Sequence, residues 1–144
     1  NSPAHVEIMV TKDGPKMVEL GSRMGGGCIT THLVPLSTGI DMIKSVMDLA
    51  LGLEPDLEPK LDKGSALRHI VGIEGVIESI EGLDEARQVP GVFEVTMLKN
   101  VGEECHYFKN GADRIGYVIA QGKDTAEAIA ICEEAIKKIN IKTK

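Results

Sequence analysis

The chain has 144 residues, of which 42% are hydrophobic and 26% are charged, and this length suffices for one or two modest hydrophobic cores. Its net charge is −6 and its lysines and arginines form no basic cluster, which argues against a nucleic-acid partner or an anionic membrane surface. Aromatic residues make up only 3% of the chain and tryptophan is absent, so stacking platforms for single-stranded nucleic acid are not expected.

Cysteine usage and hydropathy predict a soluble protein of the cytoplasm. Cys28, Cys105 and Cys132 are odd in number and lack C-x-x-C spacing, which argues against a disulfide framework or a zinc site. No apolar run approaches the roughly 18 residues of a membrane span, and no signal peptide is recognisable. Because an apolar strand follows Asn1 almost at once without an initiating Met, we expect a fragment of a longer protein.

The first pattern along the chain is that of a β-hairpin. Hydrophobic residues alternate with others over residues 5–10 and again over residues 16–21, a period typical of strands. Asp13-Gly14 lies between the two runs and is a turn signal. Together these features predict two antiparallel strands joined by a short turn.

A hairpin centred on Asp13 places two acids opposite each other. Glu7 faces Glu19 in this register, and Met9 faces Met17. Facing carboxylates repel each other and destabilise a hairpin unless a cation lies between them. Mg²⁺ prefers oxygen ligands and is commonly held by one or two carboxylates together with substrate phosphates. The pair therefore predicts a magnesium site, and the plainer alternative is a solvated strand face.

An arginine and three glycines follow the second acid. Arg23 shares the face of Glu19 if the strand continues, and its guanidinium suits a bidentate contact with a carboxylate or phosphoryl group. Gly25, Gly26 and Gly27 allow the backbone to approach an anion closely and to donate N–H groups to it. The alternative is a flexible turn without a ligand.

The rest of the chain predicts helices, a linker and short strands. Helical spacing after a capping-box-like start predicts a helix over residues 39–51. Proline and charge make residues 54–63 a predicted linker between parts 1–53 and 64–144. The second part is predicted to be α+β, with strands over residues 66–71, 75–80, 92–98 and 114–121, a helical turn over 83–87, a loop over 100–112 and a helix from Asp124.

Several motifs in the first part resemble the end of an ATP-grasp domain. They are His5-Val6-Glu7, Asp13-Gly14, Val18-Glu19-Leu20-Gly21-Ser22-Arg23-Met24-Gly25-Gly26-Gly27, Gly39-Ile40-Asp41 and Leu49-Ala50-Leu51-Gly52. The resemblance implies an α+β fold: an antiparallel hairpin plus a helix closing the ATP-grasp domain (residues 1–53), followed by a small C-terminal α+β domain (residues 64–144).

The same resemblance assigns roles to individual residues. Glu7 and Glu19 match the acids that coordinate the ATP-bound metal ions, and Arg23 matches the arginine that contacts the carboxylate substrate or the acyl phosphate. Gly25 and Gly26 lie in the loop expected to contact substrate. Gly21 departs from the pattern, because many members carry asparagine there as a further ligand, which puts two-metal coordination in doubt.

The second half is similar to the C-terminal domain of L-amino-acid ligases, and related patterns end biotin carboxylases and glycinamide ribonucleotide synthetases. The matching runs are Gly75 to Ala86, Val89 to Val92 and Ala112 to Ala120. The parent enzyme implied is a carboxylate–amine ligase that uses ATP and Mg²⁺ on small-molecule carboxylate and amine substrates. A homodimer is compatible with this resemblance, and the fragment alone is expected to be inactive. The alternative is a non-catalytic module that serves dimerisation or closes over substrate.

The histidines, Asp113-Arg114 and Cys28 are not expected to form a further metal or nucleophile site. The four histidines His5, His32, His69 and His106 share no metal-ligand spacing. Asp113-Arg114 predicts a local ion pair or a hydrogen bond that positions the loop. Cys28 has no adjacent basic partner and is not expected to be a nucleophile.

Overall fold

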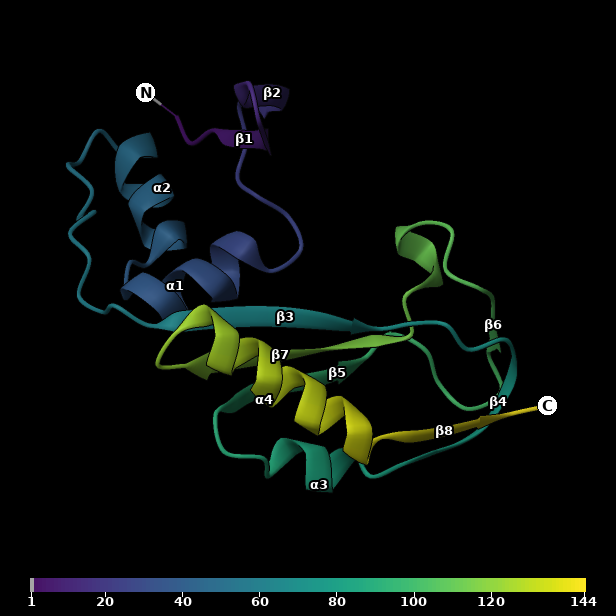
Figure 1. The fold of residues 1–144 in the computed structure, drawn as a ribbon. Coiled ribbons are helices and arrows are strands. Elements are labelled where there is room, and N and C mark those ends of the chain that lie inside the picture. Colours follow the sequence, from purple (N-terminus) through teal and green to yellow (C-terminus); the bar gives the residue numbers. More distant parts are fainter. Residues whose placement is uncertain (1) are drawn as a thin grey trace. The chain divides into compact units, whose positions relative to one another are not determined.

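The computed structural model describes residues 2–144, and the chain divides into two compact units of which the first ends at Leu61 and the second begins at Asp62 (Figure 1). Both units combine antiparallel strands with helices, so the predicted α+β class is confirmed. Within residues 2–144 there is no helix long and apolar enough to cross a membrane.

The first unit begins with the predicted hairpin, made of β1 (His5–Thr11) and β2 (Gly14–Gly21). The turn is closed by Thr11, whose Oγ1 donates a hydrogen bond to the carbonyl oxygen of Gly14 at 2.8 Å and accepts one from the N–H of Asp13 at 3.2 Å. Gly14 has a φ of 94°, a left-handed conformation that glycine adopts without strain. The turn therefore lies at Asp13-Gly14, as the sequence predicts.

The register of the hairpin is partly as predicted. Glu7 pairs with Glu19, which confirms the facing acids, but Met9 pairs with Lys16 and Met17 pairs with Ile8, so the predicted Met9–Met17 pair is wrong. The reason is that the loop contains two residues rather than being centred on Asp13. An irregularity between Glu7 and Ile8 then shifts the register by one residue and restores the pairing of the acids.

Three short helices complete the first unit: the π-helix η1 (Ile29–Leu33), α1 (Val34–Thr38) and α2 (Met42–Ala50). The helix predicted over residues 39–51 starts too early, because Gly39 has a φ of 76° and ends α1 instead. Asp41 caps α2, since its side chain accepts a hydrogen bond from the N–H of Lys44 at 2.9 Å.

The second unit is built on an antiparallel sheet of order β3-β7-β5, with β3 (Gly64–Ile70), β7 (Gly116–Gly122) and β5 (Val92–Met97). Helix α4 (Thr125–Lys138) lies along this sheet, and α3 (Leu83–Arg87) lies beside α4 (Figure 1). Small side chains let helix and sheet approach closely, and the core between them consists mainly of Ala66, Val118, Ala120, Ala128, Cys132 and Ala135.

A second sheet has the order β6-β4-β8, with β6 (Glu104–Cys105), β4 (Gly75–Glu81) and β8 (Asn140–Thr143). Its core contains Ile70, Ile77, Cys105 and Ile115. The strands predicted in this half are confirmed to within two residues at each end, as are the turn of helix at 83–87 and the helix after Asp124. Strand β8 was not predicted, and the predicted loop at 100–112 contains β6 and the start of the 3-10 helix η2 (Gly111–Asp113).

Candidate functional site

The acids of the hairpin lie on one face, and each has a basic or polar partner. Glu7 and Glu19 are cross-strand neighbours, and about half of each side chain is exposed. His5 Nε2 lies 3.2 Å from Glu7 Oε1, and Arg23 Nη2 donates to Glu19 Oε1 at 2.9 Å. The face therefore gathers two carboxylates, an imidazole and a guanidinium without burying any charge completely.

Two hydrogen bonds hold Arg23 at the end of this face, and Gly21, which has no side chain, leaves space beside it. Besides Glu19, its guanidinium donates to the carbonyl oxygen of Met24 at 3.1 Å. A Cβ atom on Gly21 would lie 3.2 Å from both Cγ and Nε of Arg23, which is tighter than ordinary contact. Glycine at this position thus leaves space for the stem of the arginine in the conformation observed.

Residues of the helix η1, which follows the glycine loop, hold the loop in place through hydrogen bonds. The side-chain hydroxyl of Thr30, a buried residue, donates to the carbonyl oxygen of Gly25 at 2.9 Å, and the N–H of Ile29 donates to that of Gly26 at 3.1 Å. A Cβ on Gly25 would lie 3.1 Å from His5 Nδ1, whereas one on Gly26 would have no atom within 4 Å. Gly25 is therefore packed against the hairpin, and Gly26 borders open space.

The structure thus brings together Glu7, Glu19 and Arg23 as the sequence predicts, and it adds His5, to which sequence reasoning gave no role. A signal was present, because His5 precedes Glu7 by two residues and period-two alternation puts both on the same strand face. Its second contact, with Gly25, joins residues twenty positions apart and has no local signature.

The two carboxylates on this face could supply part of the coordination shell of a magnesium ion. Two facing carboxylates supply hard oxygen ligands, and phosphate and water oxygens would have to complete the octahedron that Mg²⁺ demands. No group of three or more His, Cys, Asp or Glu side chains suited to hold a metal occurs in residues 2–144. A metal ion on this face would therefore need oxygen ligands beyond these two carboxylates.

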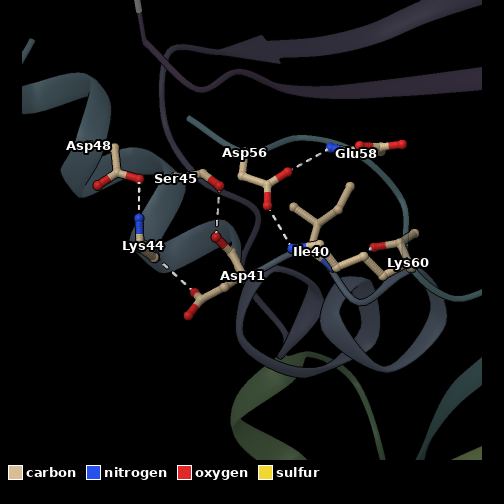
Figure 2. Close-up of polar contacts among 9 residues, drawn as sticks. Ile40, Asp41, Lys44, Ser45, Asp48, Asp56, Glu58 and Lys60 are labelled. Carbon is tan, nitrogen blue, oxygen red and sulfur yellow. Dashed lines mark hydrogen bonds and ion pairs between the residues drawn. The ribbon is translucent and has the colours of Figure 1, made fainter. Parts of the chain in front are cut away.

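A charged cavity of about 200 Å³ lies elsewhere in the first unit, between α2 and the segment that follows it (Figure 2). Lys44 Nζ donates to Asp48 Oδ2 at 2.5 Å, and Lys60 Nζ donates to Asp56 Oδ2 at 2.6 Å. The bond to Asp48 raises the pKa of Lys44, and the bond from Lys60 lowers the pKa of Asp56. Both lysines that line the cavity are thus paired with aspartates of the same cavity. We therefore interpret the cavity as a structural feature and not as a binding site.

In the second unit Asp113 positions its loop, one of the two roles predicted for it. Its Oδ2 accepts hydrogen bonds from the N–H groups of Lys109 and Asn110, each at 2.9 Å. These two bonds lower the pKa of the Asp113 carboxyl. The carboxylate therefore orders residues 109–113.

The fold is that of the C-terminal region of ATP-grasp ligases. The sequence of the hairpin, with its two acids and its arginine, resembles the same class of enzymes. Residues 69–144, just over half of the chain, match the model of the L-amino acid ligase C-terminal domain 2, and the chain belongs to this family.

Three known proteins illustrate the relationship. The chain matches the crystal structure of phosphoribosylglycinamide synthetase from Anaerococcus prevotii with a TM-score of 0.83 and 23% identity, over 98% of this chain and 37% of that one. It matches L-amino acid ligase from Bacillus licheniformis with a TM-score of 0.81 and 26% identity, over 99% and 36%. It is 28% identical to uncharacterized protein y4rH of Sinorhizobium fredii, over 96% of this chain and 29% of that protein. The chain thus spans about a third of the length of these relatives.

Proposed function

We propose that this chain forms one part of the active site of an ATP-dependent ligase that activates a carboxylate as an acyl phosphate for attack by an amine. The observation that carries the proposal is the pairing of Glu7 with Glu19 on one hairpin face, with Arg23 bonded to Glu19 at 2.9 Å. Membership in the L-amino acid ligase C-terminal domain 2 family supports it.

The reaction has two steps that conserve atoms and charge. A carboxylate oxygen of the first substrate attacks the γ-phosphorus of ATP, and the bond to the ADP oxygen breaks. The amine nitrogen of the second substrate then attacks the acyl carbon, phosphate leaves, and the nitrogen loses a proton. Catalysis of such transfers consists mainly of positioning and of neutralising developing charge.

Each residue of the hairpin face has a task in this scheme. Glu7 and Glu19 would hold magnesium, which when bound would neutralise negative charge on the phosphates of ATP. Arg23 turns its guanidinium to the acyl phosphate, for which its planar fork of donors is suited. Gly25 and Gly26 present backbone to the substrate, and Gly26 has the space to do so because nothing lies within 4 Å of its missing Cβ.

The domain assignment belongs to the same proposal. Residues 1–53 close the ATP-binding domain, residues 54–63 link it to the next domain, and residues 64–144 form a C-terminal domain of α+β type. In this proposal the adenine pocket, the lysines and the glycine-rich loop that covers the phosphates are expected in the part of the relatives' length that this chain does not span, since the chain covers 37% and 36% of the two ligases.

The experiment is to measure ADP release by the full-length protein with Mg²⁺, ATP and a panel of amino acids as carboxylate and amine donors. We expect release that requires both substrates and is lost in Glu7→Gln and in Glu19→Gln, with unfolding temperatures unchanged. Glu133→Gln, on an exposed part of α4, is the matched control and should retain activity. Full activity in both hairpin variants would overturn the proposal and favour a non-catalytic module.

A further inference from the structure

His5 differs from the residues around it in how deeply its side chain is set. Only 18% of the His5 side chain is exposed, whereas 49% of Glu7, on the same strand face, is exposed. Apolar side chains of the same hairpin are more open, and Val10 is 86% exposed. A polar ring that is covered while apolar neighbours are not indicates a specific set of contacts rather than general burial.

Both nitrogens of the ring lie against parts of the candidate site. Nε2 lies 3.2 Å from Glu7 Oε1, a hydrogen bond in which the imidazole N–H donates to the carboxylate. Nδ1 lies 3.1 Å from the position that a Cβ would occupy on Gly25. One rigid ring thus spans the distance between a proposed metal ligand and the first residue of the glycine loop.

The contacts continue on either side of this ring. Gly25 is anchored by the hydroxyl of Thr30, a buried residue, and His5 pairs across the hairpin with Gly21, whose missing side chain leaves room for Arg23. A bond to one oxygen of Glu7 restricts the rotation of that carboxylate and leaves Oε2 available to a cation. Partners of this kind orient ligating groups and raise metal affinity in other proteins.

Resting on the proposed function, we propose that His5 is a positioning residue that orients Glu7 toward the magnesium ion and sets the distance of Gly25 from the pair of carboxylates. His5 itself contacts neither ion nor substrate. Removing a partner of a ligating group typically weakens metal binding about 10- to 100-fold, and we expect a loss in this range when the ring is removed.

The test measures Mn²⁺ binding to the full-length protein by electron paramagnetic resonance, with a non-hydrolysable ATP analogue present. We expect His5→Ala to weaken Mn²⁺ binding about 10- to 100-fold and His5→Gln, which retains an N–H donor, to restore part of it. The matched control is His106→Ala, because that imidazole is largely exposed in the second unit and lies 4.0 Å from Glu104. It should leave Mn²⁺ affinity unchanged.

A double-mutant cycle separates the two contacts of the ring. Gly25→Ala should weaken binding more in the natural background than in His5→Ala, because the nearest atom to its Cβ, His5 Nδ1 at 3.1 Å, is then absent and only the two Ile29 atoms at 3.3 Å remain. Mn²⁺ affinity that depends on Glu7 but is unchanged in His5→Ala would overturn this inference and leave the proposed function standing. Mn²⁺ affinity that is unchanged in Glu7→Gln would overturn both.

Discussion

Glu19 lies between an acidic and a basic residue. Its carboxylate faces Glu7 across the hairpin and accepts a hydrogen bond from Arg23. The guanidinium offsets part of the repulsion between the two acids. Because both members of the Arg23–Glu19 pair are about half exposed, solvent screens the attraction and the pair contributes little to stability. The value of the arginine is therefore expected to lie in chemistry rather than in folding.

The substitution Arg23→Lys tests this division. Lysine keeps the charge but loses the planar fork, so we expect turnover to fall about 100-fold and the free energy of unfolding to change by less than about 1 kcal/mol. Steady-state kinetics of the full-length protein and denaturant unfolding measure the two effects. A large loss of stability with unchanged turnover would show that the arginine is structural.

Cys132 permits a prediction about pH at the same scale. Burial raises the pKa of its thiol from 9.0 to about 11, and the side chain is fully buried between α4 and the sheet. Below pH 9 the folded and unfolded states both hold the proton, so the thiol contributes no pH dependence. Between about pH 9 and 11 the unfolded chain releases the proton first, so stability falls by up to about 1.4 kcal/mol per pH unit.

Urea unfolding at several values between pH 8 and 11 measures this slope, with Cys132→Ala as the control. The alanine variant is less stable throughout because of its cavity, but it should lose the part of the slope that the thiol causes. Identical slopes in the two proteins would contradict the assignment.

Residue-level prediction from sequence succeeded where the pattern is local and failed where it is not. The facing of Glu7 and Glu19 follows from alternation and a turn signal, and the structure confirms it. The Met9–Met17 pair was wrong because the turn contains two residues instead of being centred on Asp13, and the irregularity that restores the pairing of the acids has no distinct sequence mark. The contact of His5 with Gly25 depends on how the loop folds back on the strand, which periodicity does not describe.

At the scale of elements, caps and close approaches decide where helices begin and end. Asp41 fixes the start of α2 at Met42 through its bond to the N–H of Lys44, so the helix begins later than the predicted start at residue 39. The helices η1 and α1 are five residues each, too short to show a helical period, so the sequence did not predict them. Strands β1 to β5 and β7 have six to eight residues, long enough to show alternation, and each was predicted to within two residues at either end.

Gly82 is a position where an element boundary depends on glycine. It has a φ of 81° at the start of α3, and a Cβ there would lie 1.9 Å from the carbonyl oxygen of Lys138 at the end of α4. Because backbone cannot yield as a flexible side chain does, we expect Gly82→Ala to cost about 2–5 kcal/mol, which combines overpacking with a left-handed conformation.

The control for this prediction is Gly102→Ala. Gly102 has a similar φ of 90° but no atom within 4 Å of the missing Cβ, so only the conformational cost of about 1–2 kcal/mol applies. Chemical denaturation of the two variants measures the difference. Equal losses would show that the α3–α4 junction relaxes freely.

For the molecule as a whole, the two units differ in how well they cover their apolar side chains. Strand β7 lies between two neighbours and has three residues that are fully buried, Val118, Ile119 and Ala120. In the hairpin, Val10 and Met17 are 86% and 68% exposed, and a two-stranded hairpin alone is marginally stable in water. The hairpin is therefore expected to be less stable than the sheet of the second unit.

Hydrogen exchange of the 144-residue chain tests this difference. We expect the amides of β1 and β2 to exchange near the rate of unfolded chain and those of β7 to be protected to the level of global unfolding. Equal protection of β2 and β7 in the 144-residue chain would contradict the interpretation.

The proposed function requires that the ATP-linked metal binds at Glu7 and Glu19. The most direct measurement is anomalous diffraction from crystals of the full-length protein with Mn²⁺ and a non-hydrolysable ATP analogue. We predict a manganese peak at bonding distance from carboxylate oxygens of both residues, with Arg23 turned from Glu19 to the γ-phosphate. A nucleotide-bound manganese peak that neither carboxylate contacts would contradict the account.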